Sequence, residues 1–524
     1  MTEPTETNGA HALIRTLVAC GVDTCFTNPG TSEMHFVAAL DDVTEMRGVL
    51  ALHENVATGA ADGFARMAGR PAATLLHLGP GLGNGLANLH NARKGRVPVV
   101  NIVGDHATYH KQYDAQLESD IETVARNVSS WIRWTRKPGE IGRDAAEAVA
   151  VATGPPGQVA TLILPADVSW SPGGLTAEPI PPRPPTPVDE DAVAAVAAAL
   201  RSEEPCGLLL GGDALRADGL VAASRVANAT GAKLVAETFP TRLERGAGLP
   251  PIERLPYLAE FASAQLAELR HLVLVDAKSP VSFFAYPGKP SDLVPDGCQV
   301  HVLSSGGGNA AATLEALAEA VGAPADGATR QPAERPDPPT GELTAAAVAQ
   351  AVGALMPEGA IVSDEGNTSG LFAPAMTAGA PRHDWLCLTG GAIGQGLPVA
   401  TGAAVACPDR KVIALQADGS AMYTLQALWT QAREGLDVVT IIFNNRSYAV
   451  LNMELDRVGA EAPGPHARDL LDLSRPDLDF VSLSQGLGVP ATRATTADEL
   501  VDQLGRALSS PGPALIEAIV PPVA

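Results

Sequence analysis

The stretch KVIALQADGS, residues 411–420, is followed after one helical segment by DVVTIIFNN, residues 437–445. Each begins as a nearly continuous apolar run, which is typical of a parallel strand buried on both faces of a sheet. Each ends in polar side chains, Asp418 in the first stretch and Asn444 and Asn445 in the second. Ligands of open α/β sheets bind at the carboxyl ends of the strands. The two stretches therefore predict a doubly wound parallel sheet with a binding site at this edge.

The same alternation of apolar strands and helical stretches runs through the whole chain of 524 residues. Two proline-rich stretches, residues 171–191 and 323–342, interrupt it and are typical of extended linkers. This pattern predicts an α/β protein made of three doubly wound parallel-sheet domains. We expect an N-terminal domain at residues 1–172, a middle domain at 190–324 and a C-terminal domain at 341–524.

The composition disfavours several classes of protein. Hydrophobic residues make up 46% and charged residues 18%, which is too apolar a mixture for a disordered chain. The net charge of −23 disfavours binding to nucleic acid or to an anionic membrane surface. The sequence has no apolar run long enough for a membrane span, and its polar, acidic start is unlike a signal peptide. The six scattered cysteines are typical of reduced thiols, so we expect a cytoplasmic protein.

The ends of the two quoted stretches carry ligands suited to a metal ion and to an anion. Asp418 and Asn445 are separated by one helix and one strand, so adjacent strand ends could bring their oxygens together. Carboxylate and amide oxygens are hard ligands that suit Mg²⁺, which also takes phosphate oxygens. The Gly419-Ser420 turn opens a helix whose free N–H groups can hold an anion. Either half alone is more often an ordinary turn, but together they predict a magnesium and phosphate site.

These residues resemble the cofactor-binding motif of the thiamine-diphosphate-dependent enzymes, in which a Gly-Asp-Gly start is followed by an Asn-Asn end. The resemblance covers essentially the whole chain and is strongest to benzoylformate decarboxylases and acetolactate-synthase-like proteins. It implies pyrimidine-binding, middle and diphosphate-binding domains, with thiamine diphosphate and Mg²⁺ as cofactors. It also implies that Mg²⁺ is held by Asp418, Asn445 and the backbone carbonyl of Ser447. One departure is Ala417 where the family usually has Gly, a change that costs little unless the position needs a positive φ.

Further residues are assigned to the cofactor by the resemblance alone. Gly391, in the glycine-rich stretch 390–396, would offer a backbone carbonyl to the aminopyrimidine, and Ile393 would sit between the two cofactor rings. Asn367 and Thr368 match a turn that contacts the diphosphate. The complete set implied to bind thiamine diphosphate is Glu54, Asn367, Thr368, Gly391, Ile393, Asp418, Gly419, Ser420, Asn445 and Tyr448.

Glu54 lies where a strand ends and a small-residue helix begins. A glutamate in the first turn of a helix has an ordinary explanation, because it interacts favourably with the helix dipole. The resemblance implies a catalytic role instead, in which Glu54 hydrogen-bonds N1′ of the aminopyrimidine. A carboxylic acid there stabilises the 4′-imino form, which can remove the proton from the thiazolium C2.

Two more residues are implied to act at the reacting carbon. Thr31, in the stretch Asn28-Pro29-Gly30-Thr31, takes the place of a substrate-contacting hydroxyl in benzoylformate decarboxylases. His77 matches a histidine that shuttles protons in the family, although a lone histidine at a strand end is more often structural. The catalytic residues implied by the resemblance are therefore Glu54, His77 and Thr31.

The resemblance leaves the reaction open. The decarboxylase carries a second catalytic histidine where Ala285 falls, and His106 and His110 are alternative candidates or solvated loop residues. The tryptophan by which acetolactate synthases select the acceptor is missing from the stretch 446–455. Loss of a proton-relaying histidine would slow protonation, so we expect an enzyme that decarboxylates a 2-oxo acid to an enamine and can then perform carboligation.

Three alternatives remain at this point. One is a simple benzoylformate-type decarboxylase, the second an oxidase of pyruvate type that contains FAD, and the third a catalytically inactive homologue. The glycine-rich turns of the middle segment do not match G-x-G-x-x-G, so FAD is not expected. Glu54, Asp418 and Asn445 are all present, which argues against an inactive homologue. The expected partners are a small-molecule 2-oxo acid and further copies of the chain, in a homodimer or homotetramer with active sites between subunits.

Overall fold

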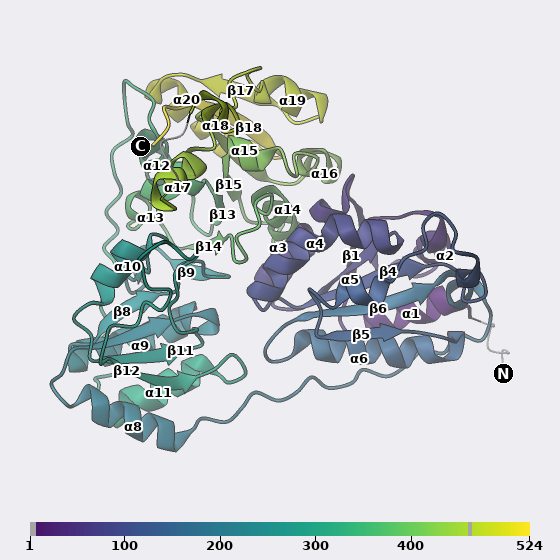
Figure 1. Cartoon of the computed structure of the whole chain (residues 1–524), viewed down its shortest axis with the longest axis horizontal. Helices are drawn as coiled ribbons and strands as arrows, with labels where there is room; N and C mark the ends of the chain where they lie inside the picture. Colours follow the sequence, from purple (N-terminus) through teal and green to yellow (C-terminus); the bar gives the residue numbers. More distant parts are fainter. Residues whose placement is uncertain (1–6, 460–463, 524) are drawn as a thin grey trace.

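The computed structural model describes residues 7–459 and 464–523 and contains three sheets flanked by helices (Figure 1). The prediction of a three-domain α/β protein is confirmed, since all pairs within the three sheets are parallel except one. We call the regions built around these sheets the N-terminal, middle and C-terminal parts. In Figure 1 the N-terminal part lies to the right, the middle part at lower left and the C-terminal part at the top. The exact domain boundaries stay a prediction.

The N-terminal part holds six parallel strands in the order β2-β1-β3-β4-β6-β5. The strands are β1 (Thr24–Asn28), β2 (Arg47–Leu50), β3 (Ala72–Leu76), β4 (Val99–Asp105), β5 (Trp131–Trp134) and β6 (Val159–Pro165). One apolar core joins the sheet to α1 (Gly9–Ala19) and α6 (Ile141–Thr153). Another core joins it to α3 (Glu54–Ala68), α4 (Leu78–Lys94) and α5 (Ile121–Ala125). Both faces are therefore covered, as continuous apolar strands require.

The middle part holds five parallel strands in the order β10-β8-β7-β11-β12. The strands are β7 (Cys206–Leu210), β8 (Lys233–Ala236), β10 (Glu253–Arg254), β11 (His271–Val275) and β12 (Gln299–Ser304). Helices α8 (Glu190–Leu200), α9 (Ala217–Thr230) and α11 (Ala310–Ala320) share one apolar core with the sheet. A smaller core on the strands includes α10 (Ala259–Leu266).

The C-terminal part holds seven strands in the order β17-β18-β16-β15-β13-β14-β9. The strands contributed by this end of the chain are β13 (Ile361–Glu365), β14 (His383–Cys387), β15 (Val412–Ala417), β16 (Val438–Asn444), β17 (Ala491–Ala494) and β18 (Ala514–Ile519). The main helices that cover it are α12 (Ala345–Leu355), α14 (Gly396–Ala406), α16 (Ala427–Glu434), α19 (Phe480–Gly486) and α20 (Ala497–Ser509).

Strand β9 (Leu243–Arg245) comes from the middle segment of the sequence but pairs with β14 of the C-terminal sheet. The pairing is antiparallel and joins Leu243 to Trp385 and Arg245 to His383. This pair is the exception to the predicted parallel pairing among the described strands. The reason is local, because a chain that only touches the sheet edge needs no crossover helix and can run in either direction.

The N-terminal and C-terminal parts are joined where α3 crosses α14. A methyl group at Gly63 would lie 2.1 Å from the carbonyl oxygen of Val399, and one at Gly402 would lie 1.8 Å from that of Ala60. The two helix backbones are thus in contact, which only glycine permits at these positions. The packing fixes the start of α3, where Glu54 lies, relative to the loop that precedes α14.

Candidate active site

The ends of β15 and β16 meet at Asp418. This residue begins the short helix α15 (Asp418–Ala421), and it is only 1% exposed. Its carboxylate accepts the N–H of Gly419 at 2.7 Å and, across the strand ends, the N–H of Arg446 at 2.7 Å. Burial raises the pKa of Asp418, while these N–H groups oppose the rise. The result is a buried pair of acceptor oxygens at the carboxyl edge of the sheet.

The turn after β16 lies against this carboxylate. Asn445 Oδ1 accepts the N–H of Ser447 at 2.9 Å. The ring of Tyr448 covers Gly419 so closely that a methyl group at Gly419 would lie 2.4 Å from Tyr448 Cε1. Ser420 lies buried in the same helical turn as Asp418. The structure therefore brings together the residues that the sequence placed at two separate strand ends.

The donor set at these strand ends fits Mg²⁺. It consists of one carboxylate, from Asp418, with the amide oxygen of Asn445 and the carbonyl of Ser447, all oxygen ligands of the kind that Mg²⁺ prefers. Within residues 7–459 and 464–523, no group of three or more His, Cys, Asp or Glu side chains is arranged to hold a metal ion. Ala417 has φ −76°, so the family glycine is not needed for backbone reasons. The assignment of Mg²⁺ to these residues stays a prediction.

A second turn, at the end of β13, lies beside this site. Asn445 Nδ2 donates to Ser369 Oγ at 3.4 Å, which joins the turn after β16 to the 3-10 helix of residues 367–372. Asn367 is exposed and Thr368 half-buried, and neither side chain forms a hydrogen bond with any other described residue. Both are thus available to a ligand at this edge, as their predicted contact with the diphosphate requires.

The glycine-rich loop before α14 approaches the same edge. Glu365, at the end of β13, accepts the N–H of Gly394 at 2.7 Å and that of Gly396 at 2.6 Å. Burial raises the pKa of Glu365, and the N–H groups that it accepts oppose the rise. Gly391 has φ +75°, and a methyl group there would lie 2.5 Å from Phe283 Cζ. Ile393, two residues on, is half-buried.

The N-terminal part contributes a second constellation around Gly81. Glu54 is the first residue of α3 and is 8% exposed, and its Oε2 accepts from Asn84 Nδ2 at 3.0 Å. A methyl group at Gly81 would lie 3.2 Å from Glu54 Oε1 and 3.5 Å from Cβ of His77. Glu54 and His77 therefore both lie close to Gly81. Asn84 is not among the residues predicted from the sequence, and the structure shows that it contacts the predicted catalytic glutamate.

Glu33 holds His77 and is not among the residues predicted from the sequence. His77 Nδ1 lies 2.8 Å from Glu33 Oε2, and the Glu33 side chain is fully buried. Burial raises the pKa of Glu33, against the opposing effects of His77 and of the Gly30 N–H, which donates to Oε2 at 2.7 Å. The signal in the sequence was a glutamate three residues after Gly30, a spacing at which the side chain can accept the N–H of the residue before a helix.

The loop of residues 28–31 packs on the same histidine. A methyl group at Gly30 would lie 2.3 Å from His77 Nδ1, so this glycine lets the loop contact the ring. Thr31, the next residue, is exposed and begins a 3-10 helix that ends at Glu33. Thr31 therefore follows directly the glycine that packs on the His77 ring.

No described histidine takes the place that the resemblance gives to a second catalytic one. Ala285 is exposed, in a loop whose Phe283 and Phe284 pack with ring centroids 4.9 Å apart. Phe283 also contacts Phe239 and Tyr257, at centroid distances of 5.8 and 5.2 Å. This aromatic cluster, comprising Phe239, Tyr257, Phe283 and Phe284, faces Gly391 through Phe283.

The two candidate substitutes lie in another loop. His106 and His110 contact each other, with ring centroids 5.3 Å apart, in the segment that follows β4. His106 Nε2 is buried without a hydrogen-bond partner among the described residues. Neither ring forms a hydrogen bond to Glu54, Thr31 or His77 in the described part of the chain. Their role stays open.

The glycine-rich turns of the middle part already have partners within the chain. The N–H of Gly212 donates to Glu237 Oε1 at 3.2 Å, and the N–H of Gly306 donates to Asp276 Oδ1 at 2.8 Å. Carboxylates thus take the N–H groups that a nucleotide phosphate would need at these turns. The expectation that FAD is not bound stays a prediction.

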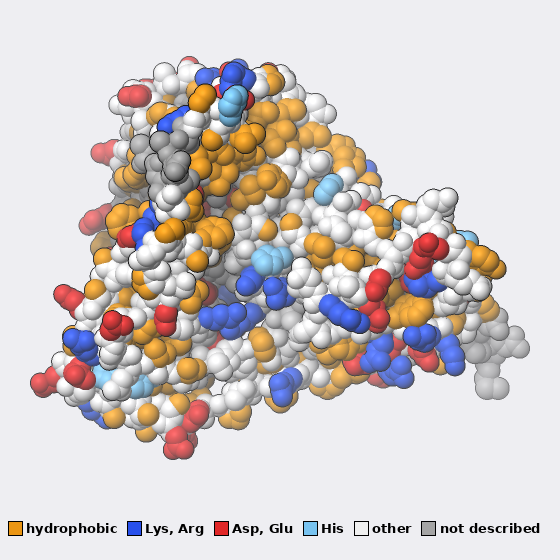
Figure 2. Space-filling model, in the orientation of Figure 1, with side chains coloured by type: hydrophobic (Ala, Val, Ile, Leu, Met, Phe, Trp, Pro, Cys, Tyr) orange, Lys and Arg blue, Asp and Glu red, His pale blue; other side chains and the backbone are white. Residues whose placement is uncertain are grey.

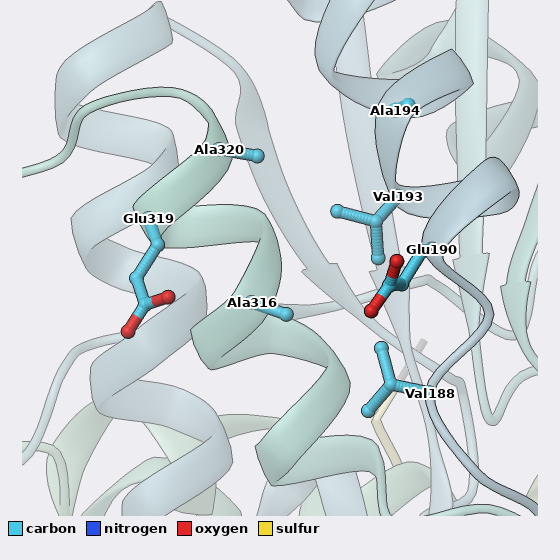
Figure 3. Close-up of a pocket in the computed structure, with 7 residues that line it drawn as sticks. All are labelled: Val188, Glu190, Val193, Ala194, Ala316, Glu319 and Ala320. Carbon is cyan, nitrogen blue, oxygen red and sulfur yellow. The ribbon is translucent and has the colours of Figure 1, made fainter.

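A groove of about 420 Å³ lies elsewhere in the middle part, between α8 and α11 (Figure 3). Its lining consists of aliphatic side chains and two glutamates, namely Val188, Glu190, Val193, Ala194, Ala316, Glu319 and Ala320. None of the predicted site residues is among them. A surface hollow of this composition lacks the convergent polar groups of a binding site.

The two constellations lie in stretches of the chain that match family models. Residues 7–125 match a family model described as thiamine pyrophosphate enzyme, N-terminal TPP binding domain, and residues 364–518 match its C-terminal TPP binding domain. The first range contains Thr31, Glu54 and His77. The second contains the glycine-rich loop and both strand ends at Asp418.

Proteins that match nearly the whole chain are also of this kind. The chain is 62% identical over 516 residues to a Mycobacterium tuberculosis protein with the name "Putative acetolactate synthase large subunit IlvX", covering 98% of this chain and 99% of that one. It is 31% identical over 538 residues to benzoylformate decarboxylase of Pseudomonas aeruginosa, covering 95% and 96%. The solved structure of a thiamine diphosphate-dependent 4-hydroxybenzoylformate decarboxylase from Rhodococcus jostii matches with a TM-score of 0.82 at 26% identity, covering 98% of this chain and 99% of that one.

No helix within the described ranges is long and apolar enough to cross a membrane.

Proposed function

Because the chain belongs to the thiamine pyrophosphate enzyme family and is an enzyme that acts on 2-oxo acids, we propose that it decarboxylates a 2-oxo acid with thiamine diphosphate and Mg²⁺ and can join the product to a second carbonyl compound. The observation that carries the cofactor assignment is the contact between Asp418 and the turn after β16, with Asp418 Oδ2 accepting the N–H of Arg446 at 2.7 Å. A buried anionic ligand next to an amide oxygen is the arrangement in which Mg²⁺ can bridge to a diphosphate.

The C-terminal part would bind the charged end of the cofactor. Asp418, Asn445 and Ser447 would hold the metal ion through oxygen atoms. The first N–H groups of α15, at Gly419 and Ser420, would donate to phosphate oxygens. Bound thiamine diphosphate supplies a carbon nucleophile and an electron sink for the loss of CO₂.

The N-terminal part would handle protons. Asn84 engages Oε2 of Glu54, so Glu54 would hold its exchangeable proton at Oε1. Glu33 Oε2 lies 2.8 Å from Nδ1 of His77, and as a carboxylate it would accept a proton-bearing Nδ1, which would leave Nε2 free to take a proton from the substrate or to return one. The exposed hydroxyl of Thr31 would orient the carboxylate of the 2-oxo acid next to this ring.

Carboligation is proposed because the second histidine position is Ala285. With a single positioned proton donor, protonation of the carbon that has lost CO₂ would be slow. A second carbonyl compound could then compete with the proton for that carbon. The experiment is an analysis of products from a panel of aliphatic and aryl 2-oxo acids, with free aldehyde and 2-hydroxyketone quantified separately. Release of aldehyde alone at every acceptor concentration would contradict carboligation.

The aromatic cluster favours a second candidate, an aryl 2-oxo acid decarboxylase. Phe283 reaches Gly391 and would place aromatic side chains beside the cofactor, a surface that suits an aryl substituent. The same product panel separates the two candidates. A kcat/KM at least tenfold higher for an aryl than for a short aliphatic 2-oxo acid, with aldehyde as the product, would favour this candidate.

We also propose that a second copy of the chain covers the cofactor site. Several large hydrophobic side chains around it are exposed, among them Leu371 at 65%, Tyr423 at 52% and Leu451 at 45%. Figure 2 shows hydrophobic side chains gathered over the C-terminal part of the molecule. Exposed apolar surface of this kind is typical of an interface. Sedimentation at assay concentration tests it, and an active monomer would contradict it.

A further inference from the structure

The loop of residues 389–396 is held from one side by α4. His90 Nε2 lies 3.1 Å from the carbonyl oxygen of Gly390. Asn91 forms a two-point contact with Ala392, donating from Nδ2 to the carbonyl oxygen at 2.8 Å and accepting the N–H at Oδ1 at 3.2 Å. Asn88 Nδ2 donates to the carbonyl oxygen of Gly394 at 3.2 Å.

These contacts alternate along the loop. Residues 390, 392 and 394 bond to α4, whereas the backbones of Gly391 and Ile393 form no hydrogen bond with any residue of the described ranges. The stretch is a turn followed by a bend rather than a strand, with φ +75° at Gly391 and +92° at Gly394. The residues that α4 leaves unbonded are the two that the resemblance assigns to thiamine diphosphate.

The two asparagines suit this task because of their chemistry and burial. A side-chain amide carries a donor and an acceptor in one plane, as a peptide group does, so one asparagine can satisfy both groups of Ala392. Asn88 and Asn91 lie three residues apart on one face of α4, and both are fully buried. They also bond to each other, since Asn91 Nδ2 donates to Asn88 Oδ1 at 3.0 Å.

Asn88 extends the contact to the helix that begins with Glu54. Its Nδ2 donates to the carbonyl oxygen of Asn55 at 2.8 Å, and its backbone N–H donates to Asn55 Oδ1 at 2.9 Å. One amide group thus bonds both to the residue after Glu54 and to Gly394. The position of the predicted catalytic glutamate and that of the glycine-rich loop are fixed by the same side chain.

We propose that Asn88 and Asn91 are positioning residues that fix the loop 389–396 through the backbones of Ala392 and Gly394, so that the unbonded backbones of Gly391 and Ile393 are held in place to contact thiamine diphosphate. The inference rests on the proposed function for the identity of the ligand. The restraint on the loop is inferred from the hydrogen bonds of Asn88 and Asn91 alone. Neither asparagine acts on the substrate; each acts through the loop backbone.

The test compares Asn91→Asp with a matched control, Asn101→Asp. The aspartate keeps the shape of Asn91 but loses the donor to Ala392 and places a carboxylate oxygen against its carbonyl. Asn101 is equally buried in β4, and among the described residues its side chain bonds to Thr74 and Thr161 alone, so its replacement removes a buried amide without touching the loop. Asn91→Ser, which introduces no charge, serves if Asn91→Asp does not fold.

Two measurements decide the proposal. In the cofactor-free protein, hydrogen exchange of the loop amides should be at least tenfold faster in the Asn91 variant and unchanged in Asn101→Asp. Calorimetric titration with thiamine diphosphate and Mg²⁺ should show a Kd at least tenfold weaker for the Asn91 variant and within twofold of the parent for the control.

The outcomes distinguish the restraint on the loop from its effect on cofactor binding. Parent-like exchange in a folded Asn91 variant, or an equal loss of affinity in Asn101→Asp, would overturn the positioning role. Faster exchange of the loop with an unchanged Kd would overturn its connection with the cofactor. A parent protein that binds no thiamine diphosphate would refute the proposed function, and with it the positioning role toward that cofactor, whatever the exchange rates show about the restraint itself.

Discussion

Glu33 Oε2 lies 2.8 Å from Nδ1 of His77. The Glu33 side chain is fully buried beneath the loop of residues 28–31. This contact selects the form of the imidazole. A carboxylate at Nδ1 favours the ring with its proton there and leaves Nε2 as the acceptor. The contact therefore decides which nitrogen of His77 can exchange a proton with a substrate.

Glu33→Gln should impair proton transfer without weakening cofactor binding. The amide of glutamine can donate to Nδ1, which favours the ring protonated at Nε2 and blocks that atom as an acceptor. Acid–base catalysis by a positioned side chain is worth roughly 10²–10⁴-fold, so we expect kcat to fall at least roughly 10²-fold. Steady-state kinetics from pH 5 to 9 and calorimetric titration of thiamine diphosphate are the measurements.

The matched control for Glu33 is Asp144→Asn. Asp144 is also a buried carboxylate of the N-terminal part, but it accepts from Thr135 Oγ1 at 3.0 Å and does not contact His77. Its replacement tests whether loss of any buried carboxylate lowers kcat. A comparable fall in both variants would show that the effect of Glu33 is structural.

Glu54→Gln should slow activation of the cofactor while leaving the fold intact. Glutamine keeps the size of the side chain and can still accept from Asn84, but it cannot hold and release a proton. We expect kcat to fall at least roughly 10²-fold, about 3 kcal/mol of barrier, with the melting temperature little changed. NMR measurement of proton exchange at C2 of the bound cofactor tests this step directly.

Glu190→Gln provides the control for the helix-dipole explanation of Glu54. Glu190 is the first residue of α8, as Glu54 is the first residue of α3. If both glutamates only favour a helix N-terminus, each replacement should cost about 0.3–1 kcal/mol of stability and leave activity unchanged. Parent-like C2 exchange in Glu54→Gln would support that explanation and refute the catalytic role.

Asp418→Asn should weaken binding of thiamine diphosphate in the presence of Mg²⁺. The amide can still accept one of the two N–H groups, but it lacks the charge that binds the cation. We expect a loss of affinity of at least tenfold, about 1.4 kcal/mol, by calorimetric titration. The control is Asp276→Asn, a buried carboxylate at the corresponding strand end of the middle sheet. Equal affinities in Asp418→Asn and the parent would refute the metal assignment.

Glu237→Gln should change how stability depends on pH. Burial raises the pKa of Glu237 to about 7, although the Gly212 N–H and Arg96 oppose the rise. A carboxyl whose folded pKa is raised stabilises the fold below its ordinary value of 4.5, and this contribution is lost as the pH rises through about 7. The free energy of unfolding of the variant should therefore rise relative to that of the parent as the pH increases from 4.5 to about 7. Above pH 8 this relative gain should be on the order of 3 kcal/mol.

Melting temperatures of Glu237→Gln and the parent at pH 4.5 and pH 8.5 test this dependence. The exposed Glu253 of the same sheet provides a control. Its replacement by Gln should change the melting temperature by the same small amount at pH 4.5 and at pH 8.5. A difference between Glu237→Gln and the parent that stays constant with pH would contradict the raised pKa.

The sequence allowed the three sheets to be predicted because their strands are nearly continuous apolar runs. The run of β15 and that of β16 each lie buried on both faces, and their polar ends meet at Asp418 because the strands are neighbours. Periodicity and adjacency in the chain were enough for this part of the site. The roles of the individual residues stay predictions.

The sequence did not allow the Glu33 contact to be predicted. It depends on the pairing of β1 with β3, which brings the loop after Asn28 beside the residue after Leu76. It depends also on the missing side chain of Gly30. Strand order within a sheet and close approach of backbones are tertiary properties, and the local pattern around Glu33 is that of an ordinary helix start.

The hydrogen bonds from Asn88 and Asn91 to the loop 389–396 could not be predicted from the sequence, for a related reason. They join α4 to a loop about 300 residues later in the chain. An asparagine within a helix carries no local signal of such a contact, because its usual tendency is to favour caps and turns. The crossing of α3 and α14 joins the parts of the molecule in which the two segments lie.

Strand β9 has a consequence for dissecting this molecule. A fragment beginning after the second proline-rich stretch would lack Leu243–Arg245 and would leave β14 with an unpaired backbone edge. Arg242, the residue before the strand, also forms an ion pair with Asp384. Open strand edges promote aggregation. The C-terminal part should therefore be produced together with the middle part, and a protease cut in the linker should leave the two pieces associated.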